Sequence, residues 1–189
     1  MGESAIRDYA RGRGFHRQTL ERWLAWAEAD RDGLAAIAAG LKASENHLRD
    51  MMDWLEEIAL RDDAKIHEIL ASPTIAAIRT DPRLGRADKL KRIKEQLRRR
   101  RFPRLAARED ALGATIKALK LPAGMRLSAP PGLEGGRLNV EFDAGSAAEL
   151  RELSERLSAA ATTDAMAQVF ALLAGRRDES GRDEAEIRG

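Results

Sequence analysis

Basic side chains concentrate between residues 83 and 108, and they could neutralise phosphate. This segment holds twelve Lys or Arg residues but only two acids, Asp88 and Glu95, so its local net charge is +10. A field of that sign attracts polyanions, and the arginine fork matches phosphate oxygens. The expected phosphate contacts are Lys89, Lys91, Arg92, Lys94, Arg98, Arg99, Arg100, Arg101 and Arg104. If six of them engage, affinity should fall ~10³-fold or more between about 50 and 200 mM salt.

The same segment predicts a helix, and more than one partner suits it. Leu90, Ile93 and Leu97 recur at helical spacing, and Pro103 should end or kink the helix. Acids within the segment are too scarce for i, i+4 pairs, which argues against a merely solvated helix face. Nucleic acid, most simply duplex DNA bound through its backbone, would satisfy the charge. An acidic protein surface, such as the acidic helices of a second copy, would satisfy it equally.

Residues 14–24 combine a turn glycine, a polar run and an apolar stripe. They read Gly14-Phe15-His16-Arg17-Gln18-Thr19-Leu20-Glu21-Arg22-Trp23-Leu24. This pattern resembles the recognition helix of helix-turn-helix DNA-binding proteins. The resemblance implies that Arg17, Thr19 and Arg22 face a major groove while Trp23 and its neighbouring leucines pack inward. The competing interpretation is a helical hairpin packed by two tryptophans.

A second stretch, residues 34–48, has the layout of the same motif. A helix of small residues leads to Gly40, and Ser44 is placed to cap the helix that follows. However, that following helix carries the acids Glu45, Asp50, Asp53, Glu56 and Glu57, which would repel phosphate. We therefore favour a packing role for this unit over DNA contact.

Residues 111–157 change character from helical to mixed. Leu112-Gly113 is followed by a short strand expected at Met125–Ser128 and a turn at Gly135-Gly136. The alternating segment Arg137–Phe142, typical of a half-buried strand, comes next, and then a helix start at Ser146 with Glu149 as a capping box. This order resembles the C-terminal dimerisation module of ParB-type chromosome-partition proteins. The resemblance implies a ββα unit that pairs two chains through residues 121–160. The nuclease-like N-terminal domain and arginine motif of that family are absent, and an ordinary ββα subdomain remains the alternative.

Nothing in the sequence favours catalysis, a metal or a cofactor. His16, His47 and His67 lack partners at metal-ligand spacing, and phosphate-loop, nucleophile-elbow and dinucleotide motifs are missing. The absence of cysteine suits a reducing compartment, so we expect a cytoplasmic protein. No apolar run is long enough to cross a bilayer.

The sequence thus predicts a mainly α protein whose parts have separate roles. We expect a helical helix-turn-helix-like region over 1–80, a basic helix and its successor over 81–120, a ββα region with a terminal helix over 121–175, and a disordered tail over 176–189. The expected function is non-enzymatic: a regulatory or accessory protein that binds nucleic acid, with a helical adaptor subunit that docks an acidic protein as the alternative.

Overall fold

A computed structural model describes residues 2–175 and is mainly helical, as the composition predicts. The chain forms two compact units, with the border between Pro103 and Arg104. This differs from the expected borders at residues 80 and 120. The basic helix belongs to the N-terminal unit because its apolar face is part of that unit's core. The predicted disordered tail lies outside the described residues.

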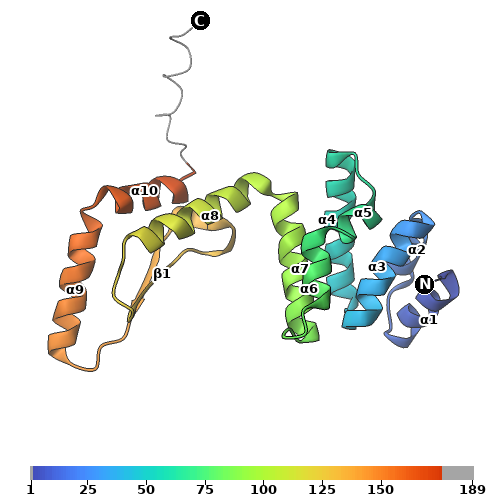
Figure 1. The fold of residues 1–189 in the computed structure, drawn as a ribbon, viewed down its shortest axis with the longest axis horizontal. Helices are drawn as coiled ribbons and strands as arrows, with labels where there is room; N and C mark the ends of the chain where they lie inside the picture. The colour runs from blue at the N-terminus through green and yellow to red at the C-terminus, as the bar shows by residue number, and fades with distance from the viewer. Residues whose placement is uncertain (1, 176–189) are drawn as a thin grey trace, which may run out of the picture. The chain divides into compact units, whose positions relative to one another are not determined.

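The N-terminal unit is built entirely from helices (Figure 1). They are α1 (Glu3–Gly12), α2 (Arg17–Leu24), α3 (Glu28–Leu41), α4 (Glu45–Asp62), α5 (Ile66–Leu70), α6 (Pro73–Thr80) and α7 (Arg86–Arg101). The helix of small residues was expected to end at Gly40, which was wrong. Helix α3 begins at Glu28, with Glu28 and Asp30 in its first turn, and runs through Gly33 and Gly40 to Leu41. A glycine inside a helix costs only about 1 kcal/mol, which packing readily offsets.

One hydrophobic core joins these helices. Leu34 and Ile37 of α3, Leu55 of α4 and Ile93 of α7 are all almost completely shielded from solvent. Helix α4 packs against α7 and α5, and α3 packs against α5 and α7. Trp23 is fully buried, and its indole nitrogen donates to the backbone oxygen of Arg31, so the largest side chain leaves no unpaired donor.

The C-terminal unit combines helices with one small sheet. Its elements are α8 (Pro103–Ala118), β1 (Met125–Ser128), a 3₁₀ segment η1 (Pro131–Gly136), β2 (Asn139–Phe142), α9 (Ala147–Ala161) and α10 (Asp164–Leu173). The strands pair antiparallel, with Met125 opposite Phe142 and Ser128 opposite Asn139. Both predicted strands are therefore present. The prediction that β2 is half-buried was wrong: Val140 is 39% exposed, although its partner Leu127 is buried.

Side-chain caps begin the last two helices. Ser146 accepts a hydrogen bond from the backbone nitrogen of Glu149 at 3.1 Å, and the Glu149 carboxylate accepts one from the backbone nitrogen of Gly145. Thr163 caps α10 in the same way through Met166. Such caps satisfy amide groups that would otherwise lack a partner at a helix start. The helix start predicted at Ser146 is thus confirmed.

Candidate binding groove along the basic helix

Helix α7 uses its apolar stripe to join the core. Leu90, Ile93 and Leu97 are buried, as their spacing predicts, and face α3, α4 and α6. This fixes the rotation of the helix and so decides where each cation points. Positions beside the stripe reach neighbouring helices, and positions opposite it meet solvent.

The cations beside the stripe are paired with acids of α4. Helix α4 carries six acids against two arginines, whereas α7 carries nine Lys or Arg against two acids. The contacts are Lys94 with Asp50 at 2.6 Å, Arg101 with Glu57 at 2.5 Å and Arg100 with Asp62 at 3.1 Å. The scarcity of acids within the basic segment was read as a sign of an external anion. The structure supplies those acids from a helix distant in sequence.

Other expected phosphate contacts are divided between internal bonds and solvent. Arg98 binds Glu95 of its own helix at 2.8 Å, and this guanidinium lowers the pKa of the Glu95 carboxyl. Lys89 donates to the backbone oxygen of Arg79 at 2.8 Å. Lys91 and Arg92 are exposed on the outer face of α7. Two residues complete the set: Arg99, which is half-buried, and Arg104, which is exposed at the start of α8 in the C-terminal unit.

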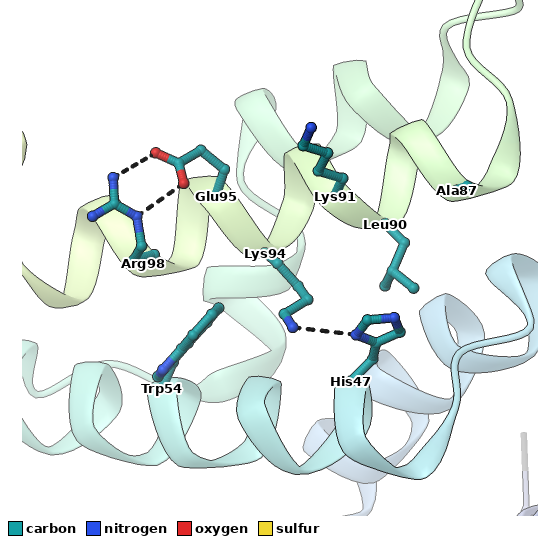
Figure 2. Close-up of a pocket in the computed structure, with 8 residues that line it drawn as sticks. All are labelled: His47, Trp54, Ala87, Leu90, Lys91, Lys94, Glu95 and Arg98. Carbon is teal, nitrogen blue, oxygen red and sulfur yellow. Dashed lines mark hydrogen bonds and ion pairs between the residues drawn. The ribbon is translucent and has the colours of Figure 1, made fainter. Parts of the chain in front are cut away.

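A largely apolar groove of about 620 Å³ lies between α4 and α7 (Figure 2). Its lining residues are His47, Trp54, Ala87, Leu90, Lys91, Lys94, Glu95 and Arg98. Figure 2 shows Leu90, Lys94, His47 and Trp54 between the two helices, with Lys91 and the Glu95–Arg98 pair along the outer edge. We call this feature the α4–α7 groove.

Lys94 lies in the α4–α7 groove, where its ammonium contacts three side chains of α4. Its ammonium lies 2.6 Å from Asp50, 3.2 Å from Nδ1 of His47 and 5.4 Å from the centroid of the Trp54 ring. The geometry allows His47 to accept the bond as a neutral ring. An ammonium over an aromatic face is attracted by the ring's quadrupole. The groove therefore keeps an apolar floor and a positive edge, with three cations and one acid among its lining residues.

The groove depends on residues that sequence reasoning passed over. Trp54 falls outside the buried stripe of α4, and Ala87 is exposed in the first turn of α7. His47 was noted only for lacking metal partners. The available signal was Trp54 itself, a large aromatic side chain placed off the core-facing stripe.

The predicted recognition helix α2 directs its key side chains toward α4. Thr19 was expected to face a DNA groove, which was wrong: it is 7% exposed, and its hydroxyl donates to Glu45 at 2.5 Å. That bond is the main reason why the pKa of the Glu45 carboxyl is lowered. The burial follows from register, since Thr19 lies four residues before Trp23, on the same side of the helix.

The two arginines of α2 differ from each other. Arg22 donates to Asp53 at 2.6 Å and to both carboxylate oxygens of Glu56, and these bonds raise the pKa of its guanidinium. The guanidinium of Arg22 is therefore already paired with acids of α4. Arg17 pairs only with Glu21 of the same helix, at 2.6 Å, and remains largely exposed. Of the three residues expected to contact a DNA groove, Arg17 is the one whose side chain remains largely exposed.

The described residues contain neither a metal-binding cluster nor a membrane-spanning helix. Within residues 2–175, no three His, Asp or Glu side chains gather in a way that could hold a metal ion. None of the helices in that range is long and apolar enough to cross a membrane. Comparison of the chain with protein-family models, with curated proteins and with solved structures finds no match.

Proposed function

We propose that this protein is a non-enzymatic, cytoplasmic helical adaptor that binds an acidic protein surface through the α4–α7 groove. The observation that carries the proposal is the groove's make-up, an apolar floor beside a cationic edge. Protein interfaces typically place such an apolar centre inside a polar rim. The floor gives a partner's apolar side chains a place to be buried, which a nucleic-acid backbone would not use.

The internal ion pairs strengthen this choice over DNA. Lys94, Arg100 and Arg101 hold α7 against α4, so much of the segment's positive charge assembles the fold. What remains at the outer surface of α7 is a smaller positive field around Arg86, Lys91 and Arg92. A field of this size suits the rim of a protein interface, where it guides encounter and selects acidic partners.

Duplex DNA binding remains the second candidate because Lys91 and Arg92 are adjacent and exposed on one helix. Phosphate contacts by these two alone predict a slope of about −2 in a plot of log affinity against log salt, compared with about −5 for six contacts. Fluorescence anisotropy of a labelled random duplex across salt concentrations measures that slope. Recognition of base sequence by α2 is disfavoured, because Thr19 is buried and Arg22 is paired with Asp53 and Glu56.

Selection from a displayed peptide library tests the adaptor function with the full-length chain as bait. We expect enriched peptides to combine Asp or Glu with large apolar residues. Their binding should fall severalfold in Lys91→Glu and change little in Arg92→Glu. The two variants make the same charge change at adjacent positions, but only Lys91 lines the α4–α7 groove. Enrichment without acidic residues, or equal losses in both variants, would contradict the function.

We also propose that the C-terminal unit pairs two chains through residues 121–160. Val140 in β2 is 39% exposed and Leu150 in α9 is 48% exposed, so each offers apolar surface to a second copy. Replacement of Leu150 by Asp should then lower the dimer fraction in sedimentation velocity. A wild-type chain that remains monomeric at every concentration would remove this proposal.

A further inference from the structure

A second apolar surface, with the opposite charge, lies on another flank of α4. It forms a shallow hollow of about 530 Å³ that we call the Leu60 surface. Its lining residues are Trp26, Ala27, Asp30, Glu56, Ala59, Leu60, Asp63, Ala64 and Ile66. Leu60 itself is 87% exposed, so its apolar side chain is accessible to a partner.

The Leu60 surface and the α4–α7 groove carry opposite charges among their lining residues. The residues that line the Leu60 surface include three acids and no Lys or Arg, whereas the groove has three cations and one acid. The Leu60 surface offers one highly exposed apolar side chain, and the groove offers an apolar floor with an aromatic wall at Trp54. Each therefore has the features that the other would recognise.

A single chain can use both surfaces with different neighbours. Trp54 lines the groove and Glu56 lines the Leu60 surface, and these residues are two positions apart on α4. At about 100° per residue they point to roughly opposite sides of the helix. The two surfaces thus cannot cover each other within one copy, but a row of copies could join surface to groove repeatedly.

We propose that the acidic partner of the α4–α7 groove is a second copy of this chain, which inserts its Leu60 surface. This inference rests on the proposed function, because it assigns the occupant of the same groove. The contact is heterologous, with different patches on its two sides, so it leads to open chains or rings. The DNA-binding candidate does not require it, and neither does pairing through the C-terminal unit.

The existing ion pairs indicate which groups would act in this contact. In the groove, Lys94 is already paired with Asp50 and Arg98 with Glu95. On the Leu60 surface, Glu56 is paired with Arg22 and Asp30 is bonded to His67, so none of these four groups has much charge to offer. Lys91 and Asp63 are both exposed and remain the natural pair across the interface. Rim pairs of this kind contribute little affinity, so burial of Leu60 should provide most of the binding.

Sedimentation velocity of the full chain over a wide concentration range tests the proposal. We expect weak self-association that rises with concentration, and a dissociation constant about tenfold larger in Leu60→Asp, the scale of one leucine's burial. Lys91→Glu should weaken it as well, whereas the matched Arg92→Glu should not. All three positions are exposed, so these variants should fold like the wild type. The variant Leu150→Asp serves as background to remove association through the C-terminal unit.

Mixing the two defective variants provides a sharper criterion. Leu60→Asp retains an intact groove and Lys91→Glu retains an intact Leu60 surface, so an equimolar mixture should associate through one wild-type contact more strongly than either variant does alone. Self-association that is unchanged in both variants would overturn the inference. If the chain does not self-associate but Lys91→Glu still loses selected acidic peptides, the inference fails and the proposed function stands. If those peptides bind Lys91→Glu normally, the proposed function itself fails.

Discussion

The two units differ in how much apolar surface they bury and in how many long-range polar contacts they form. Among residues 2–175, the core cluster of the N-terminal unit holds nineteen buried residues and that of the C-terminal unit seven. The smaller unit also leaves Val140, Leu150 and Phe170 at least 39% exposed. Since apolar burial is the main favourable term in folding, the N-terminal unit should be considerably more stable.

Long-range polar contacts should add to this difference in stability between the two units. In the N-terminal unit, ion pairs link α2 to α4 and α4 to α7 across more than thirty positions of sequence. In the C-terminal unit, the comparable long-range bond is Arg108 to the backbone oxygen of Leu172, at 2.7 Å. The comparison teaches that the chain's large positive charge first serves to hold one unit together, and only its remainder is available to partners.

The largest expected effect comes from Trp23→Ala. Removing this fully buried side chain should cost about 3–5 kcal/mol, and only the N-terminal unit should suffer. All three tryptophans lie in that unit, so the fluorescence of Trp26 and Trp54 reports its unfolding in urea, while far-UV circular dichroism reports both units. If the circular dichroism transition of the C-terminal unit moves equally, the two units unfold as one and the comparison is wrong.

A smaller effect should separate docking cations from outer ones. The double change Arg100→Glu and Arg101→Glu places like charges beside Asp62 and Glu57, which should cost the N-terminal unit about 1–2 kcal/mol. The matched double change Lys91→Glu and Arg92→Glu alters net charge equally but should cost less than about 0.5 kcal/mol. Urea midpoints followed by tryptophan fluorescence measure both. Equal losses would show that total charge, rather than pairing with α4, matters.

Local patterns of sequence were sufficient for much of the fold. The stripe of Leu90, Ile93 and Leu97 predicted both the basic helix and its buried face, and Ser146 predicted a helix start. Alternation over Arg137–Phe142 predicted the second strand, which the structure contains as Asn139–Phe142. These features depend on residues a few positions apart, so periodicity and capping chemistry reveal them.

The candidate site depends on contacts that local patterns do not contain. Lys94 meets Asp50 across 44 positions, and Thr19 meets Glu45 across 26. No spacing rule places these partners together, because tertiary packing brings them into contact. The basic segment was therefore interpreted as a site for an external anion, although acids of helix α4 already pair with several of its cations. The groove could not be predicted for the same reason, because it forms only when α4 and α7 pack together.

Loss of a cap should affect the C-terminal unit alone. Ser146→Ala removes the acceptor for the Glu149 amide and should cost about 1 kcal/mol. We expect the circular dichroism transition of the C-terminal unit to move to lower urea while tryptophan fluorescence stays unchanged. Ser146→Asp keeps an acceptor at the helix start and should restore the wild-type midpoint. A shift in tryptophan fluorescence would instead indicate that the units are coupled.

The smallest expected effect is a loss of stability in acid that arises in the N-terminal unit. Hydrogen bonds from Thr19 to Glu45 and from Arg98 to Glu95 hold both carboxyl pKa values below the usual 4.5, and Arg83 lowers the pKa of Asp81 to about 2. A carboxyl with a lower pKa in the folded state stabilises that state at pH values above its unfolded pKa. The contribution then declines as the pH falls through the folded value.

The N-terminal unit should therefore weaken progressively between about pH 4.5 and pH 2, as measured by tryptophan fluorescence in urea at each pH. Thr19→Val tests the cause, because it removes the leading contribution to the shift at Glu45 and should flatten that decline while lowering stability at neutral pH. An unchanged acid profile in Thr19→Val would mean that Glu45 is held ionised by other groups, and that α2 does not rely on this bond to remain packed on α4. A flattened profile would show that the helix once expected to read DNA is instead fixed in place by the acids of its neighbour.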